Sequence, residues 1–187
     1  MSFDLWITSN SPGEVSSWVA GVMPWIRQHR PDWRVHLLLV PCPYASGAEK
    51  RVAQAIPGFC EVMSPRETVM WYLGLTPSTT PKGDKGAVLF LGGDPWHALL
   101  LKRKLGLPVL GYFEKPSPWT RWFDGVALAY QGDIRRGSDH FVGNLMVDRL
   151  NWNPTRPEGR PVRIGLFPGS RAWQARLTLG PMLTSVQ

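Results

Sequence analysis

The sequence predicts an α/β protein built around a parallel sheet, and three observations support this. Apolar runs typical of strands alternate with segments of helical periodicity along most of the 187 residues. The apolar runs are continuous rather than alternating with polar residues, as in strands covered on both faces. Small and polar residues follow several of these runs, at the positions where open parallel sheets bind ligands.

The first strand is expected at Phe3–Thr8, and a loop of small residues follows it. A helix is expected from Val15 to about Gln28, where Pro24 predicts a kink or an early end. The other strands are expected at Arg34–Val40, Phe59–Met63, Ala87–Leu91, Pro108–Tyr112, Gly125–Ala129 and Asp139–Gly143. The other helices are expected at Ala48–Ala55, Pro65–Leu73 and Trp96–Leu105.

The proline pattern predicts a domain boundary near residue 150. Residues 1–150 are expected to form one domain, and residues 151–161, which include three prolines, a linker. A strand at Val162–Phe167 and a helical pattern to the end follow. One strand and one helix cannot form a core, so residues 162–187 are expected to begin a second, truncated α/β domain.

Composition excludes some classes of protein. Hydrophobic residues make up 43% of the chain and charged residues 19%, which excludes a disordered chain. A net charge of +7 favours anionic partners such as phosphates, acidic lipid surfaces or nucleic acid, although a solvated basic face gives the same excess. The basic residues are scattered and no nucleic-acid-binding motif accompanies them, so no nucleic-acid partner is expected.

The sequence favours a cytoplasmic protein with peripheral membrane contact. Cys42 and Cys60 have neither metal-site nor redox spacing, which suits a reducing compartment. The N-terminus has no signal-peptide pattern, and no apolar run approaches the roughly 18 residues of a membrane span. Trp18 and Trp25 in the first helix, and Trp71 in another, are candidates for a membrane interface. Alternatively, these helices simply pack on the sheet.

The loop after the first strand is a candidate binding site. Its small residues, including Ser11 and Gly13, let a ligand approach the backbone, and the following helix N-terminus favours an anion. Glu14 is a candidate catalytic carboxylate, although helix electrostatics alone would also select an acidic residue there. The glycines do not form GxGxxG, so no dinucleotide cofactor is expected.

A second candidate loop, Gly92–His97, follows another strand. Asp94, at the strand end beside an imidazole, could remove a proton from a substrate hydroxyl. Asp94 followed by proline is equally an ordinary helix N-cap.

Two further loops complete the candidates. Pro168–Arg171 offers backbone N–H groups, a hydroxyl and a guanidinium to a phosphate, but lacks the P-loop ending. After the strand at Pro108–Tyr112, Trp119 and Trp122 could stack on a sugar or cover the sheet. The histidines show no ligand spacing, so no metal site is expected.

Taken in order, these loops resemble the bacterial lipid-A-disaccharide synthases and related glycosyltransferases. The family's S-x-G-E-x-S-G-D is matched from Ser11 to Ser16, with Ser17 and Trp18 in place of Gly-Asp. Its L-x-P-G-S-R is matched fully by Leu166–Arg171. Its other three motifs are echoed by Gly93–His97, by Tyr112–Trp119, and by Val142–Asp148, where Asn144 and Leu145 replace His-Pro.

The resemblance implies a GT-B architecture, in which two Rossmann-like domains hold the acceptor and the sugar nucleotide. It implies inverting, metal-independent hexosyl transfer from a UDP-sugar to a lipid-linked acceptor sugar in lipid A biosynthesis, at the inner membrane. This chain would be an incomplete copy. The rival interpretations are a non-catalytic module that binds sugar phosphates or anionic lipid, and a UDP-sugar epimerase.

The implied site residues follow from the matched motifs. Asp94 or Glu14 would be the catalytic base. The substrate-binding residues would be Ser11, Gly13, Ser16, His97, Tyr112, Ser117, Trp119 and Asn144. The phosphates of the nucleotide would be bound by Gly169, Ser170 and Arg171.

Overall fold

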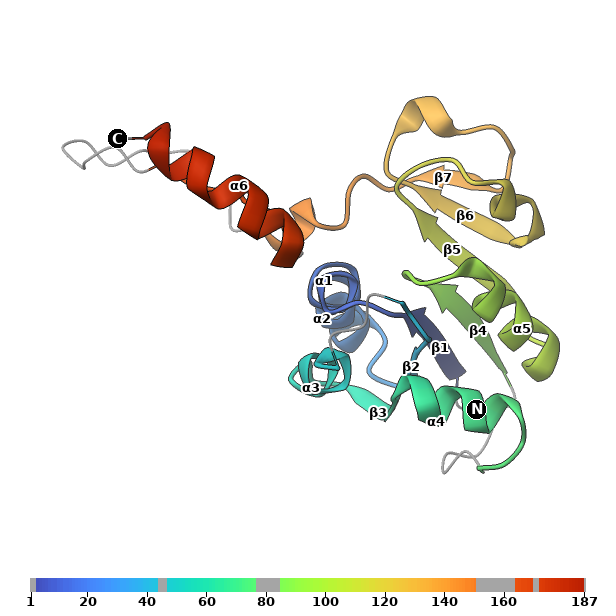
Figure 1. Ribbon diagram of the computed structural model, residues 1–187. Coiled ribbons are helices and arrows are strands. Elements are labelled where there is room, and N and C mark those ends of the chain that lie inside the picture. The colour runs from blue at the N-terminus through green and yellow to red at the C-terminus, as the bar shows by residue number, and fades with distance from the viewer. Residues whose placement is uncertain (1–2, 44–46, 77–84, 151–163, 170–171, 187) are drawn as a thin grey trace. The chain divides into compact units, whose positions relative to one another are not determined.

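The computed structural model describes residues 3–43, 47–76, 85–150, 164–169 and 172–186. The chain divides into two compact units, Met1–Leu150 and Asn151–Gln187. The first unit is a sheet with helices on both faces (Figure 1). In the second, the described residues form one helix, α6 (Ala172–Thr184), preceded by a segment without regular structure.

The first unit contains a parallel sheet of seven strands in the order β3-β2-β1-β4-β5-β6-β7. The strands are β1 (Phe3–Ser9), β2 (Trp33–Leu39), β3 (Phe59–Met63), β4 (Lys85–Phe90), β5 (Val109–Phe113), β6 (Gly125–Leu128) and β7 (Asp139–Phe141). The parallel α/β class and all seven strands expected in residues 1–150 are confirmed, with their ends shifted by one or two residues. Strands β2 and β3 are added on one side of β1, and strands β4 to β7 on the other. The boundary between β1 and β4 is therefore the topological switch point.

Helices cover both faces of the sheet (Figure 1). The first helical stretch consists of α1 (Pro12–Glu14), a π-helical segment η1 (Val15–Val19) and α2 (Ala20–His29). The other helices of the first unit are α3 (Glu49–Gln54), α4 (Pro65–Tyr72), α5 (Pro95–Leu105), and the 3₁₀ turns η2 (Pro118–Trp122), η3 (Gln131–Asp133) and η4 (Val147–Arg149). The first helix does not end early at Pro24. Met23 and Ile26 of α2 are buried in the core, and this packing offsets the missing proline N–H.

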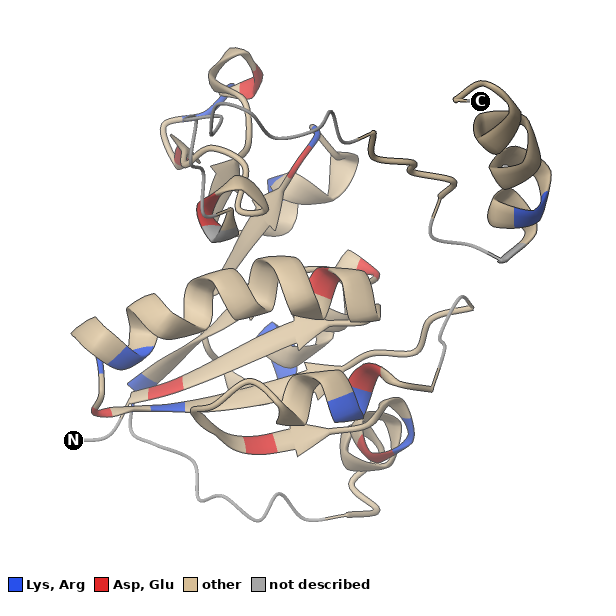
Figure 2. Ribbon diagram, turned by 90° about the vertical axis from the view of Figure 1, so that its left-hand side faces the viewer, with Lys and Arg blue, Asp and Glu red and all other residues tan. Residues whose placement is uncertain are grey.

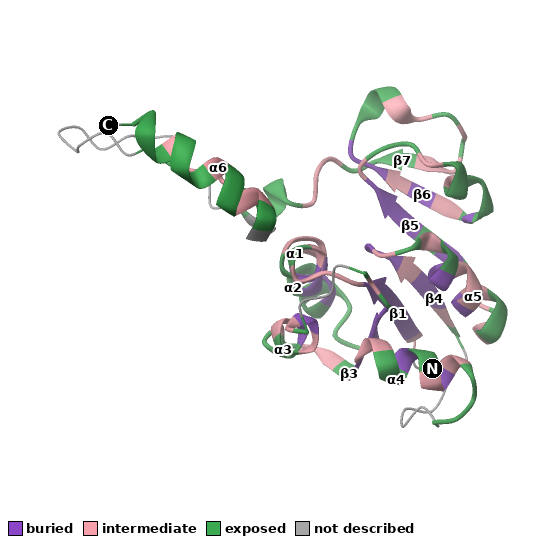
Figure 3. Cartoon of the chain, in the orientation of Figure 1, coloured by how far each residue is buried: buried purple, intermediate pink, exposed green. Residues whose placement is uncertain are grey.

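The core has two halves, one on each face of the sheet. On the first face, Val19 and Met23 from the first helical stretch pack on Ile7 of β1. On the second face, Trp6 of β1 packs with Trp71 of α4, together with apolar side chains of α5. Successive β1 residues therefore serve opposite faces, as the period of a strand requires. Figure 3 shows the buried strands between half-exposed helices.

Charged residues of both signs are interspersed over the first unit (Figure 2). One group is buried beside the start of the sheet, where Arg34 of β2 donates to both carboxylate oxygens of Asp4 at 2.7 and 2.9 Å. His36 stacks on Trp6 and lies 3.4 Å from the same carboxylate. Burial lowers the pKa of His36, and the Asp4 carboxylate opposes this shift. This group joins β1 to β2 near the amino-terminal ends of the two strands.

Residues 164–167 of the strand expected at Val162–Phe167 have no strand hydrogen bonding, which corrects this expectation for them, and residues 162 and 163 lie outside the described residues. A strand obtains its hydrogen bonds from a neighbour, and the described residues of the second unit offer only helix α6. The expected linker, residues 151–161, lies outside the described residues. Ser170 and Arg171 of the phosphate motif also lie outside them, whereas Gly169 is described and has φ +97°.

Candidate active site at the switch point

The carboxyl ends of β1 and β4 lie side by side, and the chain leaves them toward opposite faces of the sheet. After β1 it enters α1 on the first face, and after β4 it enters α5 on the second (Figure 1). The two ends are joined, since the Leu91 N–H donates to the Thr8 carbonyl at 2.9 Å and the Ser9 hydroxyl to the Leu91 carbonyl at 3.3 Å. Doubly wound sheets bind ligands beyond the carboxyl ends of the strands at such a point, where the loops diverge.

Two glycines after β4 allow side chains of the first loop to reach the β4 end. Gly92 has φ +126°, and a Cβ built there would lie 2.6 Å from Cδ of Glu14 and overlap its Oε2. Gly93 has φ +88°, and its Cβ would lie 2.5 Å from Val40 Cγ2 and 3.4 Å from Asn10 Cβ. Gly92 and Gly93 therefore place the backbone directly against Asn10 and Glu14.

Glu14 occupies an unusual electrostatic environment. Burial raises the pKa of its carboxyl group, and the backbone N–H groups of Ser11, Asn10 and Gly93 oppose this shift. The nearby charge of Glu114 raises the pKa further. Within the described residues, Oε2 is closed to solvent and has no hydrogen-bond partner. A carboxylate that is poorly solvated and has a raised pKa is a stronger base than one on the surface.

Two more unsatisfied polar atoms lie in this region. Among the described residues, Asn10 Oδ1 and Trp18 Nε1 are also closed to solvent without a hydrogen-bond partner. Trp18 lies four residues after Glu14 on the same helical stretch, whose intervening π segment is a feature often found at functional sites. Because buried polar groups are nearly always paired, a donor and two acceptors left unpaired indicate hydrogen bonds to water or to a ligand.

Tyr112 and a turn after β7 extend the site along the first face. The Trp18 ring meets the Tyr112 ring edge-on, with centroids 5.4 Å apart. The Tyr112 hydroxyl accepts a hydrogen bond from the Leu145 N–H at 3.3 Å, and burial raises the pKa of this hydroxyl. The side chain of Asn144 accepts from the Met146 N–H at 2.9 Å and so stabilises the turn. The structure thus brings Tyr112 to Trp18 and joins it to the turn beside Asn144.

Asp94 is an exposed N-cap of α5. Its Oδ1 accepts from the Trp96 N–H at 3.3 Å, and Pro95 occupies the first helical position. His97 turns into the core of the second face, where its ring stacks on Trp96 and Tyr72 at 4.0 and 5.8 Å. Burial lowers the pKa of His97, and the Asp94 charge opposes this. The N-cap interpretation of Asp94 is confirmed. The His97 N–H donates to the Asp94 carbonyl at 3.1 Å, and the described contacts include no hydrogen bond between the two side chains.

The remaining candidates in the first unit have local structural roles. Ser11 caps α1 by accepting from the Glu14 N–H at 3.3 Å, and the Gly13 carbonyl accepts from the Ser16 hydroxyl at 3.1 Å. Ser117 caps η2 by accepting from the Trp119 N–H at 3.3 Å. The Trp119 and Trp122 side chains are 40% and 55% exposed, so neither serves mainly to cover the sheet.

Two site residues, Asn10 and Trp18, were not among the individual residues that sequence reasoning proposed for binding or catalysis, and Gly92 was included only as the start of the second candidate loop. The spacing of Trp18 from Glu14 is one helical turn, which is a readable signal. The Gly-Gly pair at a strand end is another, because it predicts close approach of the backbone to some other group. Asn10 carries no comparable pattern.

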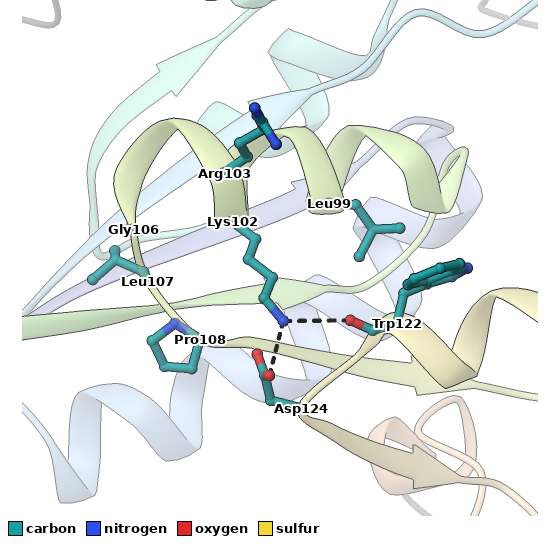
Figure 4. A pocket seen from close by; sticks show the side chains of 8 residues that line it. All are labelled: Leu99, Lys102, Arg103, Gly106, Leu107, Pro108, Trp122 and Asp124. Carbon is teal, nitrogen blue, oxygen red and sulfur yellow. Dashed lines mark hydrogen bonds and ion pairs between the residues drawn. The ribbon is translucent and has the colours of Figure 1, made fainter.

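A cavity lined by charged and apolar residues lies elsewhere in the first unit. It has a volume of about 680 Å³ and is lined by residues at the end of α5 and around the start of β5 (Figure 4). Lys102 Nζ lies 2.8 Å from Asp124 Oδ1 and 3.5 Å from the Trp122 carbonyl oxygen, so its charge is already paired. We therefore place the candidate active site at the switch point, where polar atoms lack partners.

Metal-binding clusters and membrane-spanning helices are both absent from the described residues. The part of the chain that the structure describes has no cluster of three or more His, Cys, Asp or Glu suited to a metal ion. In the same residues, no helix has the length and apolar character needed to cross a membrane.

The parallel sheet order and the helices on both faces place the first unit in the class of doubly wound, Rossmann-like α/β domains. No protein-family model matches the chain, and no curated protein matches it. One similar solved structure is MurG from Acinetobacter baumannii, with a TM-score of 0.50 and 16% sequence identity. The match covers 87% of this chain and 48% of the MurG chain, so the chain spans about half the length of MurG. At this identity the likeness concerns the fold.

Proposed function

We propose that the chain is the acceptor-binding part of a GT-B glycosyltransferase that moves a sugar from a UDP-sugar to a lipid-linked acceptor. The likeness in fold to MurG, a GT-B glycosyltransferase, supports this class of enzyme. The observation that carries the proposal is the Glu14 carboxylate at the switch point, which has a raised pKa and an unpaired Oε2. A buried carboxylate oxygen without a hydrogen-bond partner is costly to stability, and a catalytic role explains why it is there.

In the proposed reaction, Glu14 accepts the proton of the acceptor hydroxyl. The acceptor oxygen attacks the anomeric carbon of the donor, the bond from that carbon to the diphosphate breaks, and UDP leaves with the electron pair. Asn10 and Trp18 would bind neighbouring oxygens of the acceptor, which holds the reacting hydroxyl against Glu14. Gly169, Ser170 and Arg171, as in the family motif, would stabilise the charge of the leaving diphosphate.

The finer assignment is to the lipid-A-disaccharide synthase type, and it rests on sequence motifs. The matches from Ser11 to Ser16 and at Leu166–Arg171 support it. This type implies a hexosyl donor and action on the cytoplasmic side of a membrane. Of the tryptophans expected at a membrane, Trp71 is buried against Trp6, whereas Trp25 is 56% exposed. A peripheral membrane contact from the first helix would therefore use Trp25.

The test is UDP release by the full-length protein, with both GT-B domains, from UDP-N-acetylglucosamine in the presence of a lipid-linked acceptor sugar. Glu14→Gln should lower turnover by about two to four orders of magnitude. Asp94→Asn should leave it nearly unchanged, because asparagine caps helices as well as aspartate. The opposite pattern would assign the base to Asp94.

Acceptor binding provides a second measurement on the same protein. Titration of the lipid-linked sugar should show saturable binding, and Glu14→Gln should retain much of it because the amide still forms hydrogen bonds. Retained binding without UDP release from any donor would favour the non-catalytic module. Absence of both binding and release would refute the glycosyltransferase proposal.

A further inference from the structure

Two cavities that share the lining residue Arg27 lie on the side of the sheet where the strands begin, opposite the switch point. Each has a volume of about 410 Å³, and Arg27 near the end of α2 lines both. The first cavity also contacts Trp33 and Phe59, which are the first residues of β2 and β3. The length of a strand therefore separates the two cavities from the switch point, which lies at the carboxyl ends of the strands.

The first cavity is cationic. Arg27 and Arg30 line it, and no aspartate or glutamate does. Within the described part of the chain, neither arginine has an ion-pair partner, and the Arg30 guanidinium lies 5.4 Å from the Trp33 ring centroid. Basic residues in a last helical turn are favoured by the helix dipole alone. The dipole explains the charge but not the cavity that the two guanidinium groups share.

Gly58 shows how Arg27 is seated. This residue has φ +110°, and a Cβ built on it would lie 2.7 Å from Cδ and 2.9 Å from Nη1 of Arg27. Any side chain at this position would displace the Arg27 side chain. The glycine in the turn before β3 therefore holds Arg27 close to the backbone, at the junction of the two cavities.

The second cavity is mainly apolar. Besides Arg27 and Gln28 it is lined by Met23 and Pro24 from α2 and by Ile56 and Pro57 from the segment after α3. Met23 belongs to the buried core, so this cavity reaches the core of the first face. A ligand that spans both cavities would meet two guanidinium groups at one end and apolar side chains at the other.

We propose that this double cavity binds an anionic amphiphile with one alkyl chain. A phosphate or carboxylate headgroup would receive hydrogen bonds from Arg27 and Arg30, since guanidinium groups bind both anions in bidentate geometry. The alkyl chain would lie against Met23 and Ile56. The volume of each cavity falls within the range of small-molecule sites, and an apolar wall with a few polar groups is their usual lining.

Cys60 gives a direct readout of occupancy. It is exposed and lines the first cavity, whereas Cys42 lies outside both cavities and serves as an internal reference. The rate of alkylation of each thiol in the full chain can be followed by peptide mass spectrometry. Monododecyl phosphate, below the concentration at which it forms micelles, should slow alkylation of Cys60 at least fivefold and leave Cys42 unchanged.

Three comparisons separate the sources of any protection. Inorganic phosphate alone should require a concentration at least tenfold higher than the alkyl phosphate, because it lacks the chain. Dodecyl maltoside, which is neutral, should not protect. Arg27→Gln should weaken protection by the alkyl phosphate about tenfold, whereas Arg103→Gln, an exposed arginine on α5, should not.

Several results would overturn the proposal. They are no protection of Cys60, equal protection by dodecyl maltoside, or equal potency of inorganic phosphate. Unchanged protection in Arg27→Gln would do the same, provided that circular dichroism shows the variant to be folded. None of these results bears on Glu14 or on UDP release.

Discussion

Replacing Gly92 with alanine should damage both the stability and the active site of the protein. The residue has φ +126°, a conformation that alanine adopts only under strain. The added Cβ would also lie 2.6 Å from the Glu14 Cδ, against an ordinary carbon separation of about 3.5 Å. The Glu14 carboxylate must therefore retreat by about 1 Å, or the backbone must shift.

The size of the effect follows from these two contributions. Backbone strain at such a residue costs about 1–3 kcal/mol. Overpacking a filled site costs about 1–3 kcal/mol more. Gly106→Ala is the matched control, because Gly106 has φ +69° with no atom within 4 Å of its Cβ position. It should show only strain, about 1–2 kcal/mol. The effect of alanine on the unfolded chain is the same in both variants.

Urea unfolding of a double-mutant cycle measures the contact itself. Glu14→Ala removes the carboxylate that the new Cβ would meet, so the cost of Gly92→Ala should fall by about 1–3 kcal/mol in that background. UDP release by Gly92→Ala alone should fall about a hundredfold, the usual effect of a 1 Å misplacement. If Gly92→Ala costs no more than Gly106→Ala and is additive with Glu14→Ala, the described geometry of the site is wrong.

Three further predictions concern stability, each measured by urea unfolding. The raised pKa of Glu14 means that the folded state favours the protonated carboxyl group. The stability that this group contributes to the folded state is therefore present at low pH and is lost as the pH rises through the folded pKa. Glu14→Gln should therefore stabilise the protein at pH 7.5 and have little effect at pH 4; equal effects at both would contradict the sign. Ser64→Ala removes the capping box of α4 and should cost about 1 kcal/mol, whereas Ser64→Asp should cost little. Trp71→Ala should cost about 3–5 kcal/mol because the ring is buried against Trp6, while exposed Trp25 should tolerate alanine within about 0.5 kcal/mol.

The fold of the first unit could be predicted from the sequence because the residue patterns that specify its strands and helices are local. Continuous apolar runs such as Ala87–Leu91 and turn residues between them identify strands buried on both faces. The π-helical segment at Val15–Val19 was not predicted, since its hydrophobic spacing resembles that of an α-helix. The strand expected at Val162–Phe167 failed for another reason. Apolar sequence shows that a segment can pair, but pairing requires a neighbouring strand.

The candidate site was only partly predictable. Loops at strand ends were found because the position of a binding crevice follows from topology. Sequence reasoning favours Asp94 over Glu14 as the base, yet both follow strands and both open helices. What separates them is burial, which depends on contacts such as that between Gly92 and Glu14, 78 positions apart in the chain. His97 shows the same limit, because its neighbour Asp94 faces solvent while its own ring enters the core.

The sheet order has a consequence for the order in which the chain folds during synthesis. β1 is made first yet lies inside the sheet, with β2 on one side and β4 on the other. Once β2 and β3 have emerged from the ribosome, one edge of β1 is still unpaired until β4, at Lys85–Phe90, follows. That edge includes Leu5 and Ile7, which are fully apolar. An apolar strand with an open edge is a typical starting point for aggregation. A nascent chain that stops between residues 75 and 85 should therefore depend on chaperones more than chains that are some 20 residues longer.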